Sequence, residues 1–279
     1  MSKELTTIFK NLRIDEFPSR DSIVFDTVQK WIKETITAIP ESDQKYVEVE
    51  IKFGKLRSVG SDKRPVPQVN ELTVVDSNGH FRINSSVTKK VFQRLSTHVK
   101  KNNFISGSNE LPNFEHVQVR DSVYMLNNKS NSKQKIRVSR DLKTGSIIGA
   151  VKKKRINNLL LQTPGNKFDS KISISLELPE TISEQSLSGL KSTFERSKDR
   201  YSYYNKEINV TLDLTTAEEI SRKNHEIELE LNSQILLDAL NSGSDEYIIV
   251  IENLLKGHHE IIQLLDQNLL YKSKPNSQG

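Results

Sequence analysis

Short segments in which apolar and polar residues alternate dominate the middle of this chain. In KYVEVEIKFGKL, residues 45–56, valine and isoleucine alternate with Glu48, Glu50 and Lys52. This period of two is typical of a β-strand with one face on a core and the other in polar surroundings. The same alternation predicts strands at 46–56, 71–75, 80–84, 117–126, 134–141, 146–155, 168–178, 197–204, 206–214 and 224–231.

Three other segments carry apolar residues at helical spacing. Residues 21–39 form a stripe of valine, isoleucine and tryptophan behind an aspartate or serine cap. Residues 85–101 form a second stripe, and the leucine-rich region 233–270 predicts two helices that break near 241–244. Many short strands with helices at both ends predict an α+β fold, an antiparallel sheet or barrel with helices packed against it.

Composition narrows the class of protein. The chain has 279 residues, 28% of them charged, a net charge of +5 and no cysteine. This length suits one large domain, which we place at 21–271 between flexible ends at 1–20 and 272–279. Without cysteine there is no disulfide framework and no thiolate zinc site, and the mild positive charge favours an anionic partner. No apolar run is long enough to predict a membrane span.

Separating each predicted strand into its two faces reveals charged sides. Glu226, Glu228 and Glu230 share one face of HEIELELN, and like charges about 7 Å apart along a strand are unfavourable without counter-ions. The other polar faces carry Lys135, Arg137 and Ser139; Val151, Lys153 and Arg155; Asp169, Lys171, Ser173, Ser175 and Glu177; Arg196, Lys198 and Arg200; and Thr211, Asp213 and Thr215.

The ordinary explanation of any one such strand is a solvated outer face. Together, the faces fit a barrel whose outer wall is covered by helices, so that the charged sides point into a polar lumen. Clustered carboxylates without thiolates suit hard cations such as Mg²⁺ or Mn²⁺, and Arg and Lys suit phosphates. This combination of groups is typical of phosphoryl transfer.

Sequence motifs of other chemistries are absent. The chain has no G-x-x-x-x-G-K-[ST], H-E-x-x-H or G-x-S-x-G pattern. We interpret His258 and His259 as an exposed helix end and His225 as a strand-edge residue, none of them a metal ligand. Trp31 is interpreted as a packing residue.

The charged strands also resemble a known family. VEVEIKFG and HEIELEL resemble the paired glutamate strands of the fungal RNA 5′-triphosphatases (mRNA-capping enzyme beta subunits), which are triphosphate tunnel metalloenzymes. Between them, RDSVY, KIRVSRDLKTG, VKKKRINNLLL, DSKISISLELP, RSKDRYSY and LDLT follow that family's order. The resemblance implies an eight-stranded antiparallel barrel with a charged lumen. It also implies nuclear removal of the γ-phosphate from 5′-triphosphate RNA with Mg²⁺ or Mn²⁺, the first step of mRNA capping.

The resemblance implies roles for individual residues. Glu177 and Glu226 match carboxylates that orient the attacking water, with Glu177 the closest to a general base. The metal ligands would be Glu48, Glu50 and Glu230, and the positions holding metal-bound waters would be Asp121, Asp213 and Glu228. The γ-phosphate clamp would be Arg137, Lys198 and Arg200, with Lys153 and Arg196 as further basic wall positions.

The sequence departs from the family's pattern in two places. Thr211 stands where the family often has a basic residue, which is expected to weaken phosphate binding or change substrate preference. No tryptophan-containing N-terminal segment of the kind that holds a guanylyltransferase is recognisable, so that partner stays open and a capping-independent paralogue is an alternative. A homodimer is a further expectation.

Two other functions fit the same charged residues. One is hydrolysis of inorganic polyphosphate or free nucleoside triphosphates by an enzyme of the same fold. The other is a non-catalytic protein that binds RNA ends, which only Thr211 favours.

Overall fold

The computed structural model describes residues 20–75, 79–105, 113–127 and 133–266. The predicted flexible ends lie outside the described residues, except for Arg20, whose guanidinium pairs with Glu252 at 2.6 Å. The strands are β1 (Val47–Ser58), β2 (Thr73–Val75), β3 (Phe81–Asn84), β4 (Asn113–Asn127), β5 (Lys133–Asp141), β6 (Ile147–Gln162), β7 (Asp169–Pro179), β8 (Phe194–Asn205), β9 (Val210–Glu219) and β10 (Arg222–Leu231). The helices are α2 (Ile23–Thr37), α3 (Glu41–Gln44), α4 (Lys89–Val99), α5 (Glu184–Leu187), α6 (Ser233–Ser242) and α7 (Ser244–Asp266).

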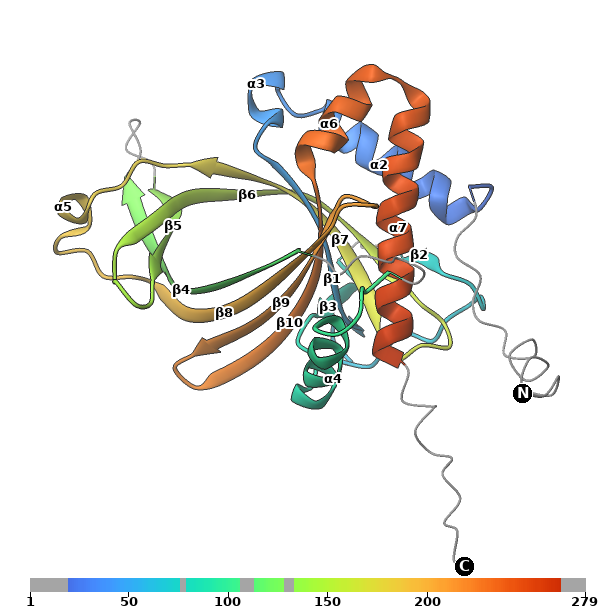
Figure 1. The fold of residues 1–279 in the computed structure, drawn as a ribbon, viewed down its shortest axis with the longest axis horizontal. Helices are drawn as coiled ribbons and strands as arrows, with labels where there is room; N and C mark the ends of the chain where they lie inside the picture. Colours follow the sequence, from blue (N-terminus) through green and yellow to red (C-terminus); the bar gives the residue numbers. More distant parts are fainter. Residues whose placement is uncertain (1–19, 76–78, 106–112, 128–132, 267–279) are drawn as a thin grey trace, which may run out of the picture.

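The strands form one antiparallel sheet that closes on itself. Its order is β10-β9-β8-β4-β5-β6-β7-β1, and β1 pairs again with β10, so eight strands make a closed barrel. β3 pairs with the end of β1, and β2 pairs with β6. The barrel strands curve to one side of the molecule, and α2, α6 and α7 gather on the other (Figure 1). The predicted α+β barrel is confirmed.

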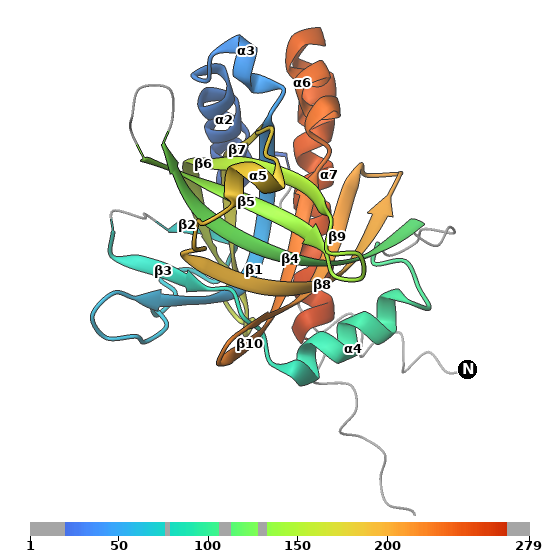
Figure 2. The same ribbon diagram turned by 90° about the vertical axis from the view of Figure 1, so that its left-hand side faces the viewer.

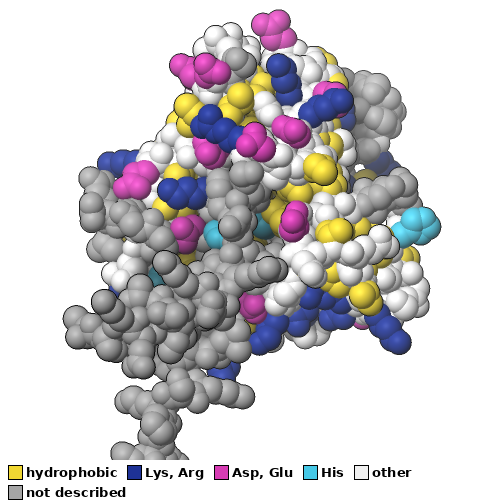
Figure 3. Space-filling model, turned by 90° about the vertical axis from the view of Figure 1, so that its right-hand side faces the viewer, with side chains coloured by type: hydrophobic (Ala, Val, Ile, Leu, Met, Phe, Trp, Pro, Cys, Tyr) yellow, Lys and Arg dark blue, Asp and Glu magenta, His cyan; other side chains and the backbone are white. Residues whose placement is uncertain are grey.

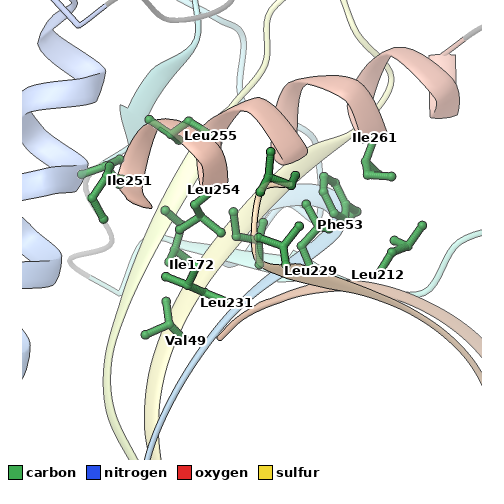
Figure 4. Packing of buried hydrophobic residues seen from close by; sticks show 14 of the residues in the cluster. Val49, Phe53, Ile172, Leu212, Leu229, Leu231, Ile251, Leu254, Leu255 and Ile261 are labelled. Atoms are coloured by element: carbon green, nitrogen blue, oxygen red, sulfur yellow. The ribbon is translucent and has the colours of Figure 1, made fainter. Parts of the chain in front are cut away.

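The main hydrophobic core lies outside the barrel, between its wall and the helices. Val49 and Ile51 of β1 and Leu229 of β10 are 0% exposed and belong to this core. Helix α7 places Leu254 and Leu255 over these strands (Figure 4), and α4 packs against β10 (Figure 2). Since these aliphatic side chains point outward, the residues that alternate with them must point into the barrel.

The helices begin and end close to the expected residues. The Ser22 hydroxyl accepts a hydrogen bond from Phe25 N and caps α2, and Thr88 caps α4 in the same way. The predicted break near 241–244 is confirmed, because α6 ends at Ser242 and α7 starts at Ser244. None of the helices among the described residues is long and apolar enough to cross a membrane.

The histidine pair in α7 is not the exposed helix end that the sequence predicts. α7 continues through Gly257, where a Cβ would already touch side chains of the β9–β10 wall at 3.4 Å, so the helix packs close. His258 is therefore only 2% exposed. Its Nε2 lies 2.8 Å from Ser170 Oγ, and its ring stacks on Phe53 at 5.6 Å. His225 packs against Phe92 of α4 with the two rings tilted, outside the lumen.

Most strands differ by a few residues from their predicted bounds, with β4 starting at Asn113 instead of 117 and β8 at Phe194 instead of 197, and in two strands the structure shows why. β9 starts at Val210 instead of 206, because the Asn205 side chain accepts hydrogen bonds from Glu207 N and Ile208 N and holds residues 206–209 in a turn. β6 continues past 155 to Gln162, with a shift in register between Arg155 and Asn157. The predicted hairpin turn after Asp141 is confirmed, with Gly145 at φ 74°.

Candidate active site

Charged side chains from many strands meet inside the barrel. Arg137 on β5 donates to Glu177 on β7 at 3.1 Å, although β6 lies between these strands. Arg200 on β8 reaches Glu228 on β10 at 3.8 Å across β9. Contacts that pass over an intervening strand require side chains on the concave face. The charged faces therefore line one lumen, as the alternation predicts.

The seam between β1 and β10 brings two acidic strands together. Glu50 is the direct cross-strand partner of Glu230, and Lys52 is the partner of Glu228. Cβ atoms of directly opposed residues lie about 4.5–5.5 Å apart, so the two carboxylates of the first pair destabilise each other unless a cation lies between or beside them. Glu48 lies on the same face and accepts from Ser175 Oγ at 2.8 Å.

Among the carboxylates of this seam, Glu230 has the fewest basic or hydrogen-bonding partners for its charge. Burial, with Glu48 and Asp213 nearby, raises the pKa of Glu230 to about 8. Burial also raises the pKa of Glu50, although Lys52 opposes the shift. Within the described ranges, no ion pair or hydrogen bond from a side chain reaches the Glu230 carboxylate. These are the electrostatics of a site that gains from a bound cation.

The opposite wall holds the basic side chains. Lys198 pairs with Asp121 at 2.6 Å, and Arg200 pairs with Asp213 at 2.9 Å. Arg196 lies 3.6 Å from the same Asp121 carboxylate. Burial and the neighbouring Arg196 lower the pKa of Lys198 to about 8 although Asp121 opposes the shift, so Lys198 stays mostly protonated at neutral pH.

Glu177 is held ionised by basic neighbours. Its burial raises its pKa, but Arg137 and Lys153 outweigh burial and lower the pKa below its ordinary value. A carboxylate of this kind accepts hydrogen bonds well and holds a proton poorly. The geometry therefore favours a water-orienting role for Glu177 over storage of the water proton. Glu226 lies 3.9 Å from Arg196 at the other side of the lumen.

The residues present fit a hard divalent cation in their chemistry, although the cage is not preformed. Among the described residues no group of three or more His, Asp or Glu side chains is close enough to hold a metal ion. Oxygen donors nevertheless come from adjacent strands, and Oδ1 of Asp213 is buried without a hydrogen-bond partner. Carboxylate oxygens of this kind are the ligands that Mg²⁺ and Mn²⁺ prefer.

The structure adds basic residues that the predicted site omits. Lys52 pairs with Glu50 at 3.0 Å and also contacts Glu228. Lys171 faces Lys52 across β1 and β7, and burial together with Arg155 lowers the Lys171 pKa. Lys52 is four residues from Glu48 on β1, and Lys171 is six residues from Glu177 on β7, so each lysine lies on the same strand face as its glutamate. The alternation alone therefore places both lysines in the lumen. Thr211 pairs in register with Glu230, leaving a hydroxyl beside that carboxylate.

On the helix-covered side, acidic and basic side chains mix in the upper part of the face, and basic side chains gather along its lower edge (Figure 3). In the lumen, Glu48 and Glu50 of β1 lie beside the three glutamates of β10, and β8 carries Arg196, Lys198 and Arg200. Fold and lumen together define a closed antiparallel tunnel with charged side chains of both signs on its inner wall.

Comparison with known proteins places the chain more narrowly. The family described as mRNA capping enzyme, beta chain, matches residues 19–269, and the chain belongs to this family. It is 30% identical to the mRNA-capping enzyme subunit beta of Candida glabrata over 88% of this chain and 42% of that protein. It is 28% identical to the polynucleotide 5′-triphosphatase CTL1 of Saccharomyces cerevisiae over 71% of this chain and 64% of CTL1.

A solved structure shares the fold. The Pct1 RNA triphosphatase of S. pombe, solved in complex with the Spt5 CTD, superposes with a TM-score of 0.75 at 24% identity, covering 88% of this chain and 94% of the solved chain. The chain spans less than half the length of the curated relatives first matched, 42% and 48% of them.

Proposed function

We propose that this chain is a metal-dependent polynucleotide 5′-triphosphatase, which releases the γ-phosphate of 5′-triphosphate RNA and leaves a 5′-diphosphate end. One observation carries the proposal: ion pairs such as Arg137–Glu177 and Arg200–Glu228 each pass over an intervening strand on the inner wall of the barrel, and they bring carboxylates and basic groups to one enclosed site. The naming of the family and of CTL1 supports the same activity.

Glu48, Glu50 and Glu230 would hold Mg²⁺ or Mn²⁺. Asp121, Asp213 and Glu228 would accept hydrogen bonds from waters around the metal. The bound cation supplies charge neutralisation at the γ-phosphate oxygens.

Arg137, Lys198 and Arg200 would bind the γ-phosphate, with Lys153 and Arg196 extending the basic wall. The Arg137 Nε–H is buried and donates to no group among the described residues, so it is available to a phosphate oxygen. A phosphate bound beside Lys198 would raise the pKa of this lysine above its value of about 8 and hold its ammonium group in the charged form.

Glu177 and Glu226 would orient the water that attacks the γ-phosphorus in line with the bridging oxygen. Because Arg137 and Lys153 keep the pKa of Glu177 low, Glu177 stays an acceptor throughout neutral pH. Positioning and charge neutralisation are the main sources of rate in phosphoryl transfer, and this lumen supplies both.

The test is release of phosphate from γ-labelled triphosphate RNA with Mg²⁺ or Mn²⁺. Glu48→Ala and Glu230→Ala should each abolish measurable release, whereas Glu218→Ala is the matched control. Glu218 pairs with Lys223 at the exposed end of the β9–β10 hairpin, 3.4 Å apart and away from the lumen. Full release by the two lumen variants would refute the site.

Thr211 favours a second candidate, hydrolysis of tripolyphosphate or free nucleoside triphosphates by the same site. Because Thr211 places a hydroxyl, and not a basic side chain, beside Glu230, the lumen has one cation fewer to bind a long RNA substrate. Competition between triphosphate RNA and tripolyphosphate decides between the two substrates. A strong preference for tripolyphosphate with RNA left intact would select the second candidate.

The biological setting is part of the proposal. We infer a nuclear role in mRNA capping with a guanylyltransferase as partner, in line with the relatives named as capping-enzyme beta subunits. Co-purification of this chain with a guanylyltransferase would test that partner. The homodimer stays a prediction that solution mass would test.

A further inference from the structure

Two lysines of the lumen each bridge a pair of carboxylates. Nζ of Lys153 on β6 contacts Glu48 Oε2 on β1 and lies 3.2 Å from Glu177 Oε1 on β7. Nζ of Lys52 lies 3.0 Å from Glu50 Oε2 and contacts Glu228 Oε1 on β10. In each bridge, one carboxylate is a proposed metal ligand on β1 and the other is a proposed water-binding or water-orienting group.

The ammonium groups compete with a metal for the same oxygens. A hard divalent cation binds carboxylate oxygens at about 2.0–2.2 Å. An ammonium group on the same oxygen would then lie within a few Å of two added positive charges, which is strongly unfavourable in a partly buried site. Glu48 Oε2 and Glu50 Oε2 therefore hold either a lysine or a metal.

We propose that Lys52 and Lys153 are exchangeable counter-ions: each holds its β1 glutamate until a divalent cation binds, and the released ammonium group then binds the triphosphate. The proposal rests on the metal dependence of the proposed function. Metal binding and triphosphate binding then strengthen each other. The metal takes the place of the ammonium group at the glutamate, and the triphosphate gives the released ammonium group a new anionic partner.

The side chains can make this exchange without unpacking the barrel. Lys153 keeps 33% of its side-chain surface accessible and Lys52 keeps 22%, although protein surrounds both. A lysine has a flexible four-carbon stem and a compact charge, so its ammonium group can move several Å while its backbone stays in the strand. An arginine fork would be less suited to such a move.

Lys171 provides a matched control. It lies in the same lumen and is the cross-strand partner of Lys52. Throughout the described ranges no ion pair or hydrogen bond joins Lys171 to a carboxylate. Lys171→Met therefore removes one positive charge from the lumen, as Lys153→Met does, but vacates no glutamate oxygen.

The experiment measures Mn²⁺ binding to chelator-treated protein by electron paramagnetic resonance of free Mn²⁺, without substrate or turnover. Lys153→Met should bind Mn²⁺ about tenfold more tightly than the unmodified chain, a difference of about 1.4 kcal/mol. Lys52→Met should act in the same direction, Lys171→Met should change the affinity less than twofold, and Glu230→Gln should weaken it. Circular dichroism confirms that each variant is folded.

A second measurement tests the transfer to phosphate. With Mg²⁺ present, a nucleoside triphosphate carrying a methylene group at the β–γ bridge should bind Lys153→Met at least fivefold more weakly than the unmodified chain. Looser binding of the analogue combined with tighter binding of Mn²⁺ is the expected pattern for an exchangeable counter-ion.

The outcomes separate this inference from the proposed function. If Lys153→Met and Lys171→Met tighten Mn²⁺ binding equally, the cause is a through-space effect of charge and the exchange is wrong. Weaker Mn²⁺ binding by Lys153→Met, or unchanged binding of the analogue, would also overturn the exchange. If Mn²⁺ binds to Lys52→Met and Lys153→Met but not to the unmodified chain, the result supports the exchange in its strongest form. If none of the proteins binds Mn²⁺, the exchange is wrong, and the phosphate-release assay independently decides the proposed function.

Discussion

Protonation of His258 should make the stability of this barrel fall in mild acid. The ring is buried between α7 and the β1–β7 wall, stacked on Phe53, with Nε2 at Ser170 and no hydrogen-bond partner for Nδ1 among the described residues. Burial, with a small contribution from His259, lowers the pKa of His258 to about 3. In the unfolded chain the pKa returns to about 6.5.

The sign and size of the effect follow from linkage. Between pH 6.5 and pH 3 the unfolded chain binds a proton that the folded chain does not, so stability falls as pH falls through this window. Above about pH 6.5 both states are neutral at this residue and its contribution is constant. At pH 5 the loss relative to pH 8 is about 1.4 kcal/mol per pH unit over 1.5 units, or about 2 kcal/mol.

The assay is urea denaturation at pH 8 and pH 5 for the unmodified chain and for His258→Gln. Other groups titrate in both proteins, so the measured quantity is the difference between the two pH-induced changes. His258→Gln should be less stable at pH 8 through lost packing, yet should lose about 2 kcal/mol less on going to pH 5. Ser170→Ala, which removes only the hydroxyl partner, should keep the pH sensitivity. Parallel losses in His258→Gln and the unmodified chain would refute the reasoning.

Three further predictions concern the barrel wall and the lumen. Gly54→Ala places a Cβ 2.2 Å from Asn84 O, so it should destabilise the fold by about 2 kcal/mol or more in urea denaturation, and an unchanged midpoint would contradict this. Glu177→Gln should lower kcat for phosphate release at least about a hundredfold with little change in KM, whereas a raised KM alone would indicate a binding role. Arg200→Met leaves Asp213 without its ion-pair partner and Glu228 with Lys52 alone, so it should cost about 3 kcal/mol of stability, and adding Asp213→Asn should restore part of the stability but no activity.

The alternation of residue types predicted the part of the fold that positions the site. A strict period of two runs from Val47 to Phe53 in β1 and from Glu226 to Leu231 in β10, so each glutamate could be assigned to the face opposite the aliphatic residues. The helical stripes then supplied the cover that the apolar faces need. The resemblance added the number of strands, and the closure between β1 and β10 agrees with it.

Where the alternation of polar and apolar residues breaks, the sequence does not predict which side chains face the lumen. β6 contains a register shift between Arg155 and Asn157, after which Asn158 pairs with Ser173 and the inward positions change from odd to even. The predicted strand ends at 155, the residue at which this shift begins. The burial of His258 depends on the close approach of α7 at Gly257, a tertiary contact that no local pattern encodes.

The separation of core and site explains how this barrel can keep so many charges inside. Ile227, Leu229 and Leu231 are at most 1% exposed and secure β10 from outside, while the three glutamates that alternate with them face the lumen. Hydrophobic stabilisation therefore comes from the helix-covered wall and depends little on how the lumen charges are paired. Ion pairs across the lumen offset the cost of burying those charges and contribute little net stability. Lys153→Met, which removes one charge but leaves the helix-covered wall intact, can then alter ligand binding while the chain still folds, which is the property that an exchange of lysine for metal requires.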